Sequence, residues 1–381
     1  MRHSVTHILQ SSPVKSICTA LFFGAFCALS ACIKTDEGVL VIGAVLPTTG
    51  DAATFGQNAA NGAQLAVEVA AKQKLLGNTK VRLIVEDSRG TPTDAAAAGK
   101  KLLDVDAAKL LIGDVTSAGT HTLIPIVTQA KVPLVSPAAS DPDLSGKSPF
   151  FARVWPSDNY EASVIGKYAL MKNYKRMAVI YANTDYGVGM VKALRNTVPT
   201  ENLVLDIPVE RAVADFRPSL KRAQLDKADA FFVVLYPEDG KRFLTQSAEV
   251  GVTLPILATA TMEDPGIAAT PGANRLVFAS PVPPDDKIDS RATFLKAYKE
   301  KFGKEAGVLS DTGYDSAMIL IKAWATAGKT GQLAVVDAIR AMKDYPGMSG
   351  TMSFDKNGDV IKSYGLKTVD KGAFTWVKKN D

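Results

Sequence analysis

Two polar turns of the chain carry residue types suited to binding chemistry. The first turn, Asp114 to Gly119, and the second, Pro137 to Asp141, are rich in Ser, Thr, Ala and Gly. Small hydroxyl side chains and exposed backbone N–H groups at a helix start suit a carboxylate or another small anion, because the helix end adds partial positive charge. The two turns therefore predict a site for a small anionic ligand.

The elements around these turns read as one βαβ unit. Lys109 to Gly113 and Val132 to Ser136 are short apolar runs that predict strands, and Ala118 to Ala130 has the spacing of a helix. The strands of such a unit are parallel, so the turns after their carboxyl ends lie side by side at one edge of the sheet, where small ligands bind. We expect both polar turns to line one site.

The first residues of the chain have the pattern of an export signal. Arg2 and Lys15 precede an apolar run, Ile17 to Leu29, which is too short for a typical membrane-spanning helix. The run leads into Leu29-Ser30-Ala31-Cys32, which resembles a bacterial lipobox, where cleavage before the cysteine leaves a lipid-modified amino terminus. The alternative is an ordinary signal cleaved near Ala31. We therefore expect an exported protein that is anchored to the membrane only by lipid on Cys32.

The residue after Cys32 bears on the membrane that would hold this anchor. It is Ile33 and not Asp, which by resemblance to the known sorting rule weakly favours the outer membrane of a double-membraned bacterium. Either membrane would place the protein at the periplasmic face of the envelope.

Composition limits the classes of function. A chain of 381 residues with 46% hydrophobic and 22% charged residues is long enough for two lobes, each with its own core. The net charge of +5 falls to about +3 without the leader and the basic residues are spread, so we expect no nucleic-acid partner. Cys18, Cys27 and Cys32 all lie in or at the end of the leader, so the body lacks a disulfide, a thiolate metal site and a cysteine nucleophile.

Enzymatic chemistry has little support. His121 is the only histidine left after removal of the leader, which excludes most Ser-His and His-metal schemes, and no nucleophile-base pair suggests a hydrolase. The Gly187 to Gly189 and Gly146 to Ser148 segments lack the full glycine patterns of dinucleotide and phosphate loops. Asp355 to Asp359 lacks the Gly spacing and terminal Glu of a calcium loop. We expect a binding protein with no cofactor or metal.

Strands and helices alternate along the chain in two series, which predicts an α/β fold with two doubly wound, Rossmann-like lobes. The predicted strands of the two series begin at Val39, Lys80, Lys109 and Val132, and at Met177, Leu203, Ala230, Ile256 and Leu276. Three crossings are predicted, near Phe150 to Asp158, at Pro281 to Pro284 and near Gly347 to Phe354. The predicted parts are a signal peptide (1–31), a lipidated linker (32–38), an amino-terminal lobe (39–154 plus 283–346) and a carboxyl-terminal lobe (155–282 plus 347–381).

The order of these segments resembles the type I periplasmic binding proteins of ABC transporters, in particular the branched-chain amino acid group. The resemblance runs from about Val39 to Val377 and rests on motifs that are each weak but occur in the expected order: IGAVLPTTGDAATFGQ, NGAQLAVE, LIGDVTSAGT, VPLVSPAASDP, YANTDYGVG and SGTMSFDKNGD. It implies hinge crossings, closure around a ligand and delivery of that ligand to an ABC permease.

The resemblance also implies roles for particular residues. Ser117, Ala138 and Ser140 match the positions that hold the ligand carboxylate, and Tyr186 matches a tyrosine that closes over the ligand from the second lobe. Ser117 and Ser140 also have the alternative role of helix caps, and Tyr186 that of a packing residue between the lobes. Phe55, predicted in a loop after the first strand, either forms a wall of the pocket or packs on its own lobe.

One position departs from the pattern. Where the amino-acid binders place an acid against the ligand ammonium, this chain has Ala260, with Glu263 three residues on. An ammonium without its carboxylate would cost about 1–3 kcal/mol, roughly ten- to hundredfold in affinity. Glu263, Glu238 or Asp185 could substitute, or the ligand is an aromatic acid or an amide without the amine.

The predicted function is capture of a small carboxylate-bearing solute, an amino acid or a related acid or amide, for an ABC permease. An alternative keeps the fold and not the transport: a ligand sensor, or an outer-membrane lipoprotein that activates an envelope enzyme. The sequence leaves the identity of the ligand open.

Overall fold

A computed structural model describes residues 38–282 and 289–377 of the chain. The predicted signal peptide, Cys32 and the prolines at 283 and 284 lie outside these described residues. The described strands form two large sheets and one small sheet.

The first large sheet has the strand order β2-β1-β3-β4-β5, and all its pairings are parallel. Because β1 lies between β2 and β3, the direction of winding reverses there, and such a switch point leaves a crevice at the carboxyl ends of the strands. The strands are β1 (Val39–Leu46), β2 (Lys80–Asp87), β3 (Leu110–Gly113), β4 (Leu134–Ser136) and β5 (Phe151–Arg153).

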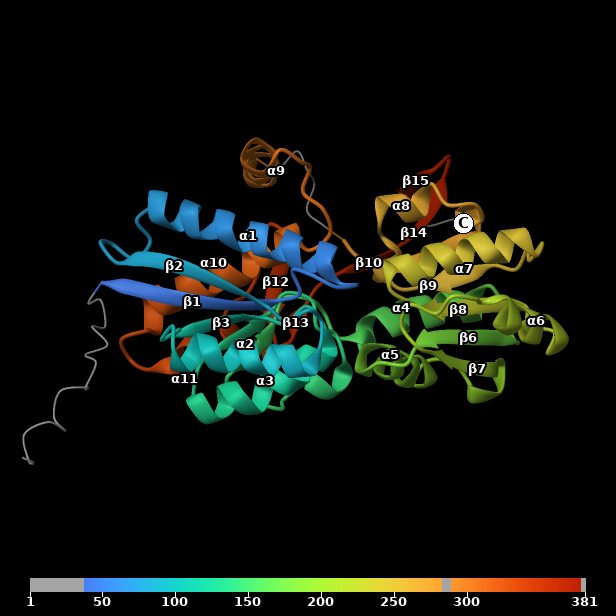
Figure 1. The fold of residues 1–381 in the computed structure, drawn as a ribbon, viewed down its shortest axis with the longest axis horizontal. Helices are drawn as coiled ribbons and strands as arrows, with labels where there is room; N and C mark the ends of the chain where they lie inside the picture. Colours follow the sequence, from blue (N-terminus) through green and yellow to red (C-terminus); the bar gives the residue numbers. More distant parts are fainter. Residues whose placement is uncertain (1–37, 283–288, 378–381) are drawn as a thin grey trace, which may run out of the picture. The chain divides into compact units, whose positions relative to one another are not determined.

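Alternation along β1 accounts for helices on both faces of this sheet. Leu40, Ile42 and Ala44 pack in one core with helices α1 and α10, whereas Val41 and Val45 pack in another with α2 and α3. Figure 1 shows α1 along one side of the sheet and α2 and α3 along the other. The helices of this lobe are α1 (Ala53–Lys72), α2 (Pro92–Asp104), α3 (Ser117–Ala130), α9 (Asp289–Phe302), α10 (Ser310–Ala327) and α11 (Gln332–Arg340).

Helix α1 begins earlier than its glycines suggested, so the prediction of a loop around Phe55 is wrong. Gly56 and Gly62 lie inside the helix at close approaches to other backbone. A Cβ on Gly62 would lie 1.8 Å from the carbonyl oxygen of Ser310, and one on Gly313 would lie 2.2 Å from the carbonyl oxygen of Ala59. These glycines let the backbones of α1 and α10 pack in direct contact. Gly62 therefore serves this packing and does not end the helix.

The second large sheet has the order β15-β14-β10-β9-β8-β6-β7 and is parallel except at β14 and β15. Helices α4 and α5 pack on one face, and α6, α7 and α8 pack on the other. Its strands are β6 (Met177–Ala182), β7 (Leu203–Val209), β8 (Ala230–Val234), β9 (Ile256–Ala258), β10 (Leu276–Pro281), β14 (Tyr364–Asp370) and β15 (Ala373–Trp376). Its helices are α4 (Asp158–Met171), α5 (Asp185–Arg195), α6 (Arg217–Leu225), α7 (Pro237–Glu249) and α8 (Pro265–Ala268).

The third crossing lies further along the chain than predicted. Strands β11 (Tyr345–Gly347), β12 (Gly350–Phe354) and β13 (Val360–Ile361) form the small sheet. Met352, Phe354 and Val360 are fully buried in the core that contains β1 and α10, because their side chains complete that apolar face. The chain therefore joins the second sheet only at β14, and the boundary predicted at 347 is wrong.

The fold class predicted from the sequence, α/β with two doubly wound lobes, is confirmed. Helix α11 was not predicted. Within the described residues, every helix is too short or too polar to cross a membrane.

Candidate functional site

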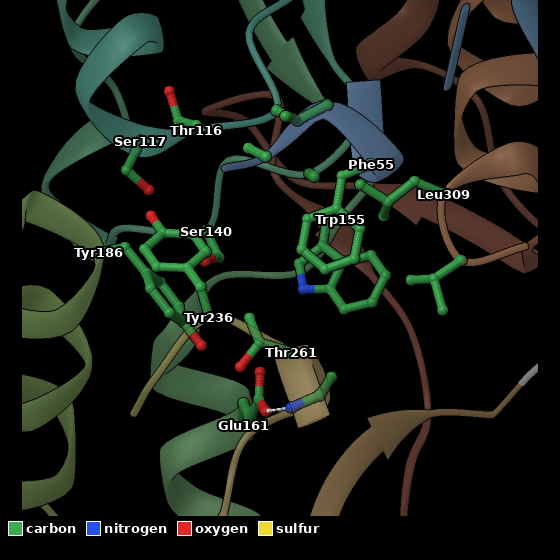
Figure 2. A pocket seen from close by; sticks show the side chains of 15 residues that line it. Phe55, Thr116, Ser117, Ser140, Trp155, Glu161, Tyr186, Tyr236, Thr261 and Leu309 are labelled. Carbon is green, nitrogen blue, oxygen red and sulfur yellow. Dashed lines mark hydrogen bonds between the residues drawn. The ribbon is translucent and has the colours of Figure 1, made fainter. Parts of the chain in front are cut away.

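A cavity lies at the carboxyl ends of β1, β3 and β4, where the switch point of the first sheet predicts a crevice. The empty space within it is about 580 Å³, counted with the open solvent at its mouth. Residues of both lobes line it (Figure 2), and they include Phe55, Ser117, Ala138, Ser140 and Tyr186, five of the six predicted ligand contacts.

Ser117 is buried and is not the cap of its helix. The side chain of Thr116 caps α3 by accepting the Gly119 N–H at 3.1 Å. Ser117 Oγ accepts the Asp141 N–H at 3.3 Å, a long hydrogen bond that leaves the hydroxyl proton of Ser117 available for an anion. The alternative role of Ser117 as a cap is thus taken by its neighbour.

Side chains of β4 and β5 fix the position of the second turn, Pro137 to Asp141. Ser136 Oγ accepts the Ala139 N–H at 2.9 Å and the Ala138 N–H at 3.3 Å. The fully buried guanidinium of Arg153 donates to the carbonyl oxygens of Ala139, at 3.3 Å, and of Asp141, at 2.9 Å. These contacts fix the position of Ser140, which lies between the two carbonyls and lines the cavity.

Arg153 also ties this turn to the small third sheet. Its Nε donates to Asp359 Oδ1 at 2.7 Å, and another of its nitrogens donates to Ser145 Oγ at 2.8 Å. A planar guanidinium can make these bonds at the same time because its donors form a rigid fork. Asp355 and Asp359, considered above as part of a calcium loop, thus lie in a turn, and the carboxylate of Asp359 has an arginine partner.

Tyr186 presents its ring to the cavity, because its hydroxyl is already bonded. Its Oη donates to Thr259 Oγ1 at 2.7 Å, which lies 2.8 Å from Thr261 Oγ1, and Thr261 in turn donates to the carbonyl of Leu235 at 2.8 Å. Burial raises the pKa of Tyr186 well above its usual value. The tyrosine therefore acts as a neutral aromatic wall.

Three further aromatic side chains line the cavity. The Tyr236 ring lies 5.9 Å from that of Tyr186, and the guanidinium of Arg211 covers Tyr236 at 4.4 Å from the ring centre. Figure 2 shows the rings of Phe55 and Trp155 on the opposite side from the two tyrosines. A flat or apolar ligand group would be enclosed between these walls.

None of the three acids considered as substitutes for Ala260 lines this cavity. Glu263 lines a neighbouring cavity, where it accepts a hydrogen bond from Ser280 Oγ at 2.7 Å and pairs with Lys367. Glu238 is exposed and pairs with Lys241, and Asp185 is exposed at the start of α5. The second-lobe wall of this cavity is therefore formed without these three acids.

The acid that does line the cavity is Glu161, in the first turn of α4. Its side chain is buried, and Oε1 accepts the N–H of Ala260 at 2.6 Å. Burial and the neighbouring Asp158 raise the pKa of Glu161 well above its usual value, and burial raises that of Asp158 to about 7. The backbone N–H of Ala260 thus binds the carboxyl group of Glu161, which belongs to α4.

The sequence contained a signal for Glu161 that our reading did not use. Glu161 shares one face of α4 with Ala162 and Ile165, which are buried. An acid in the apolar stripe of a helix is expensive to bury and calls for a functional explanation. Trp155 had a weaker signal, an aromatic residue within the first crossing.

Comparisons with known proteins identify the relatives of this chain. Residues 39–373 match the family described as periplasmic binding protein. A Leu/Ile/Val-binding protein, BraC3, from Rhizobium johnstonii is 26% identical over 343 residues, which cover 87% of this chain and 92% of that protein. Both matches span nearly the whole described chain.

Solved structures of binding proteins are also similar to this chain. The leucine binding protein LivK from Thermotoga maritima has a TM-score of 0.81 and 29% identity, covering 89% of this chain and 98% of that one. A solute binding protein of an ABC transporter from Rhodopseudomonas palustris, in complex with 3,4-dihydroxybenzoic acid, has a TM-score of 0.79 and 23% identity, covering 88% and 94%. The second likeness establishes the fold alone.

Proposed function

Because the chain belongs to the type I periplasmic binding proteins, in the branched-chain amino acid group, we propose that it captures a small carboxylate-bearing solute and delivers it to an ABC permease. The members of this family are solute-binding proteins rather than enzymes. The observation that carries the proposal is the cavity between the two lobes, with hydroxyl-bearing turns on one side and aromatic walls on the other.

Binding of a carboxylate at the first-lobe turns follows from the donors there. The hydroxyls of Ser117 and Ser140 and the amino-terminal end of α3 provide partial positive charge without a cation. Tyr186 and its neighbours would complete the site from the second lobe. Since contacts with both lobes exist only when the cleft is closed, the ligand favours the closed population.

The same proposal includes export and a lipid anchor on Cys32. The support is the leader sequence, which lies outside the described residues. The alternative function, a ligand sensor or an outer-membrane activator of an envelope enzyme, has the support of Ile33 after Cys32.

A thermal-unfolding screen of amino acids, aromatic acids and amides tests the binding proposal. A true ligand present at a hundred times its dissociation constant should add about 2.7 kcal/mol to the free energy of unfolding. The proposal is abandoned if no carboxylate in such a screen raises the unfolding temperature. Loss of solute uptake in cells that lack the gene would support transport over sensing.

A further inference from the structure

The cavity has a polar side chain at each end. Figure 2 shows Ser117 at one end and Glu161 at the other, with the rings of Tyr186 and Tyr236 on one side and those of Phe55 and Trp155 on the other. An α-amino acid carries its carboxylate and ammonium on a single carbon atom. With its carboxylate at Ser117 and an aliphatic side chain directed at Glu161, it would leave a buried carboxyl without a ligand partner.

The charged side chains that line the cavity also limit which ligand it can bind. Among the described residues that line the cavity, Glu161 is the one carboxyl, and none is Lys, Arg or His. An ionised Glu161 would share a closed, low-dielectric space with the carboxylate of the ligand, and like charges in such a space disfavour each other's ionised form. The raised pKa of Glu161 agrees with a neutral side chain.

A neutral carboxyl group has one hydrogen-bond donor, its O–H group. Since Oε1 of Glu161 accepts the Ala260 N–H at 2.6 Å, the other carboxyl oxygen is left to carry the proton and to act as a donor. Thr261, whose hydroxyl already donates to Leu235, lines the cavity near Glu161 and retains acceptor capacity. A hydroxyl group of a ligand can accept from Glu161 and donate to Thr261.

We propose that the solute is an aromatic carboxylate that carries a hydroxyl group on the ring at the end opposite the carboxylate, and that Glu161 recognises this hydroxyl as a hydrogen-bond donor. This inference rests on the proposed capture of a carboxylate by the first-lobe turns. Four aromatic walls suit a flat ring, and the two ends of the cavity suit the two polar groups of such a molecule.

Three probes of nearly equal shape test the inference by calorimetry on the full mature chain: benzoate, 4-hydroxybenzoate and 4-methylbenzoate. The methyl group matches the hydroxyl in size but makes no hydrogen bond. We expect the wild-type protein to bind 4-hydroxybenzoate at least tenfold more tightly than 4-methylbenzoate. Equal affinity for these two acids overturns the inference even if Glu161 variants fail to fold.

Variants of Glu161 separate a neutral donor from a charged partner. Glu161→Gln keeps a donor and an acceptor, so the preference for the hydroxyl should persist within about threefold. Glu161→Met removes both and should reverse the preference in favour of 4-methylbenzoate. Glu201→Met, an exposed substitution outside the cavity, serves as the matched control and should leave all three affinities unchanged.

The possible failures are distinguishable. If leucine binds more tightly than any of the aromatic acids and loses tenfold or more in Glu161→Gln, then Glu161 is an ammonium partner and the inference is wrong. If all three aromatic acids bind equally, the inference fails but carboxylate capture stands. If no carboxylate binds at all, the proposed function itself fails.

Discussion

At the scale of single residues, the site depends on which hydroxyls are left free by the local structure. Thr116 caps α3, and Asp141 begins the short 3-10 helix Pro142–Leu144 with its own side chain. Neither Ser117 nor Ser140 is therefore needed as a cap. Their hydroxyls are candidates for the ligand because neighbouring residues satisfy the helix ends, and the Ser140 hydroxyl also interacts with the buried carboxyl of Asp158.

Replacing both serines should weaken ligand binding without unfolding the protein. Hydrogen bonds to a charged group contribute about 1.5–3 kcal/mol each, so Ser117→Ala with Ser140→Ala should lower affinity for the carboxylate ligand by at least tenfold. Calorimetry measures the affinity, and Ser290→Ala, on the exposed start of α9, is the control. Unchanged affinity in the double variant would refute the placement of the carboxylate.

The raised pKa of Asp158 predicts that the stability of the folded protein depends on pH. Burial raises its pKa from 3.8 to about 7 in the folded protein. The folded state therefore binds this proton more tightly than the unfolded state, and the resulting stabilisation is present below about pH 4 and is lost as the pH rises through about 7. Relative to Asp158→Asn, the wild-type protein should become more stable between pH 7.5 and pH 5 by at least about 1 kcal/mol.

Urea unfolding of the two proteins across this pH range measures that difference. The comparison with Asp158→Asn matters because other carboxyls, such as Asp87, have lowered pKa values and shift the total stability in the opposite direction. Parallel stability curves for the two proteins would contradict the assignment to Asp158.

At the scale of elements, the ligand turn after β4 depends on one side chain of β5. Arg153 is fully buried and joins the carbonyls of Ala139 and Asp141 to Asp359, more than two hundred residues away. Removal of the guanidinium would leave a buried carboxylate and two carbonyls without this partner. The rigidity of the site is thus coupled to the small third sheet.

Arg153→Met should lower the free energy of unfolding by about 3–5 kcal/mol, because breaking a buried ion pair leaves the remaining charged group buried without a partner. Arg153→Met combined with Asp359→Asn should recover part of this loss, since no charge is then left uncompensated. Denaturant unfolding of the single and double variants forms the test. A loss below about 1 kcal/mol in the single variant would mean that the pair does not hold the turn.

At the scale of the whole molecule, ion pairs join the two lobes near the cavity. Arg211, after β7, pairs with Asp51 at 3.2 Å and covers the ring of Tyr236. Lys192, on α5, pairs with Asp143 at 2.9 Å, but both of those side chains are more than half exposed. The first pair combines charge with an aromatic contact at the cavity wall, whereas the second is an ordinary surface pair.

The two pairs should differ in their effect on ligand affinity. Arg211→Met removes a cation–π contact and an interlobe pair, so we expect an affinity loss of about three- to tenfold through a less favourable closure equilibrium. Lys192→Met should change affinity less than about threefold, because exposed pairs contribute about 1 kcal/mol or less. Equal effects of the two substitutions on the dissociation constant would contradict this difference.

The sequence by itself determined the order of strands and helices and the rim on which the polar turns meet. Apolar runs such as Val39–Leu46 and the helical spacing of α3 are local patterns, and parallel strands bring the turns after β3 and β4 to one edge. This is why the two turns that contain Ser117, Ala138 and Ser140 were predicted to line one site, whereas the three residues themselves were singled out by the resemblance. Tyr186 was predicted by the resemblance, and Phe55 by its position after the first strand.

Only the tertiary structure decided which acid reaches the cavity and where the chain last passes between the lobes. Glu161 is held by the backbone of Ala260, ninety-nine residues along the chain, while Glu263 turns to Lys367 in the neighbouring cavity. The burial of Met352 and Val360 in the first core likewise depends on α10 and β1. Such outcomes follow from packing between distant segments, and no local pattern of residue types encodes them.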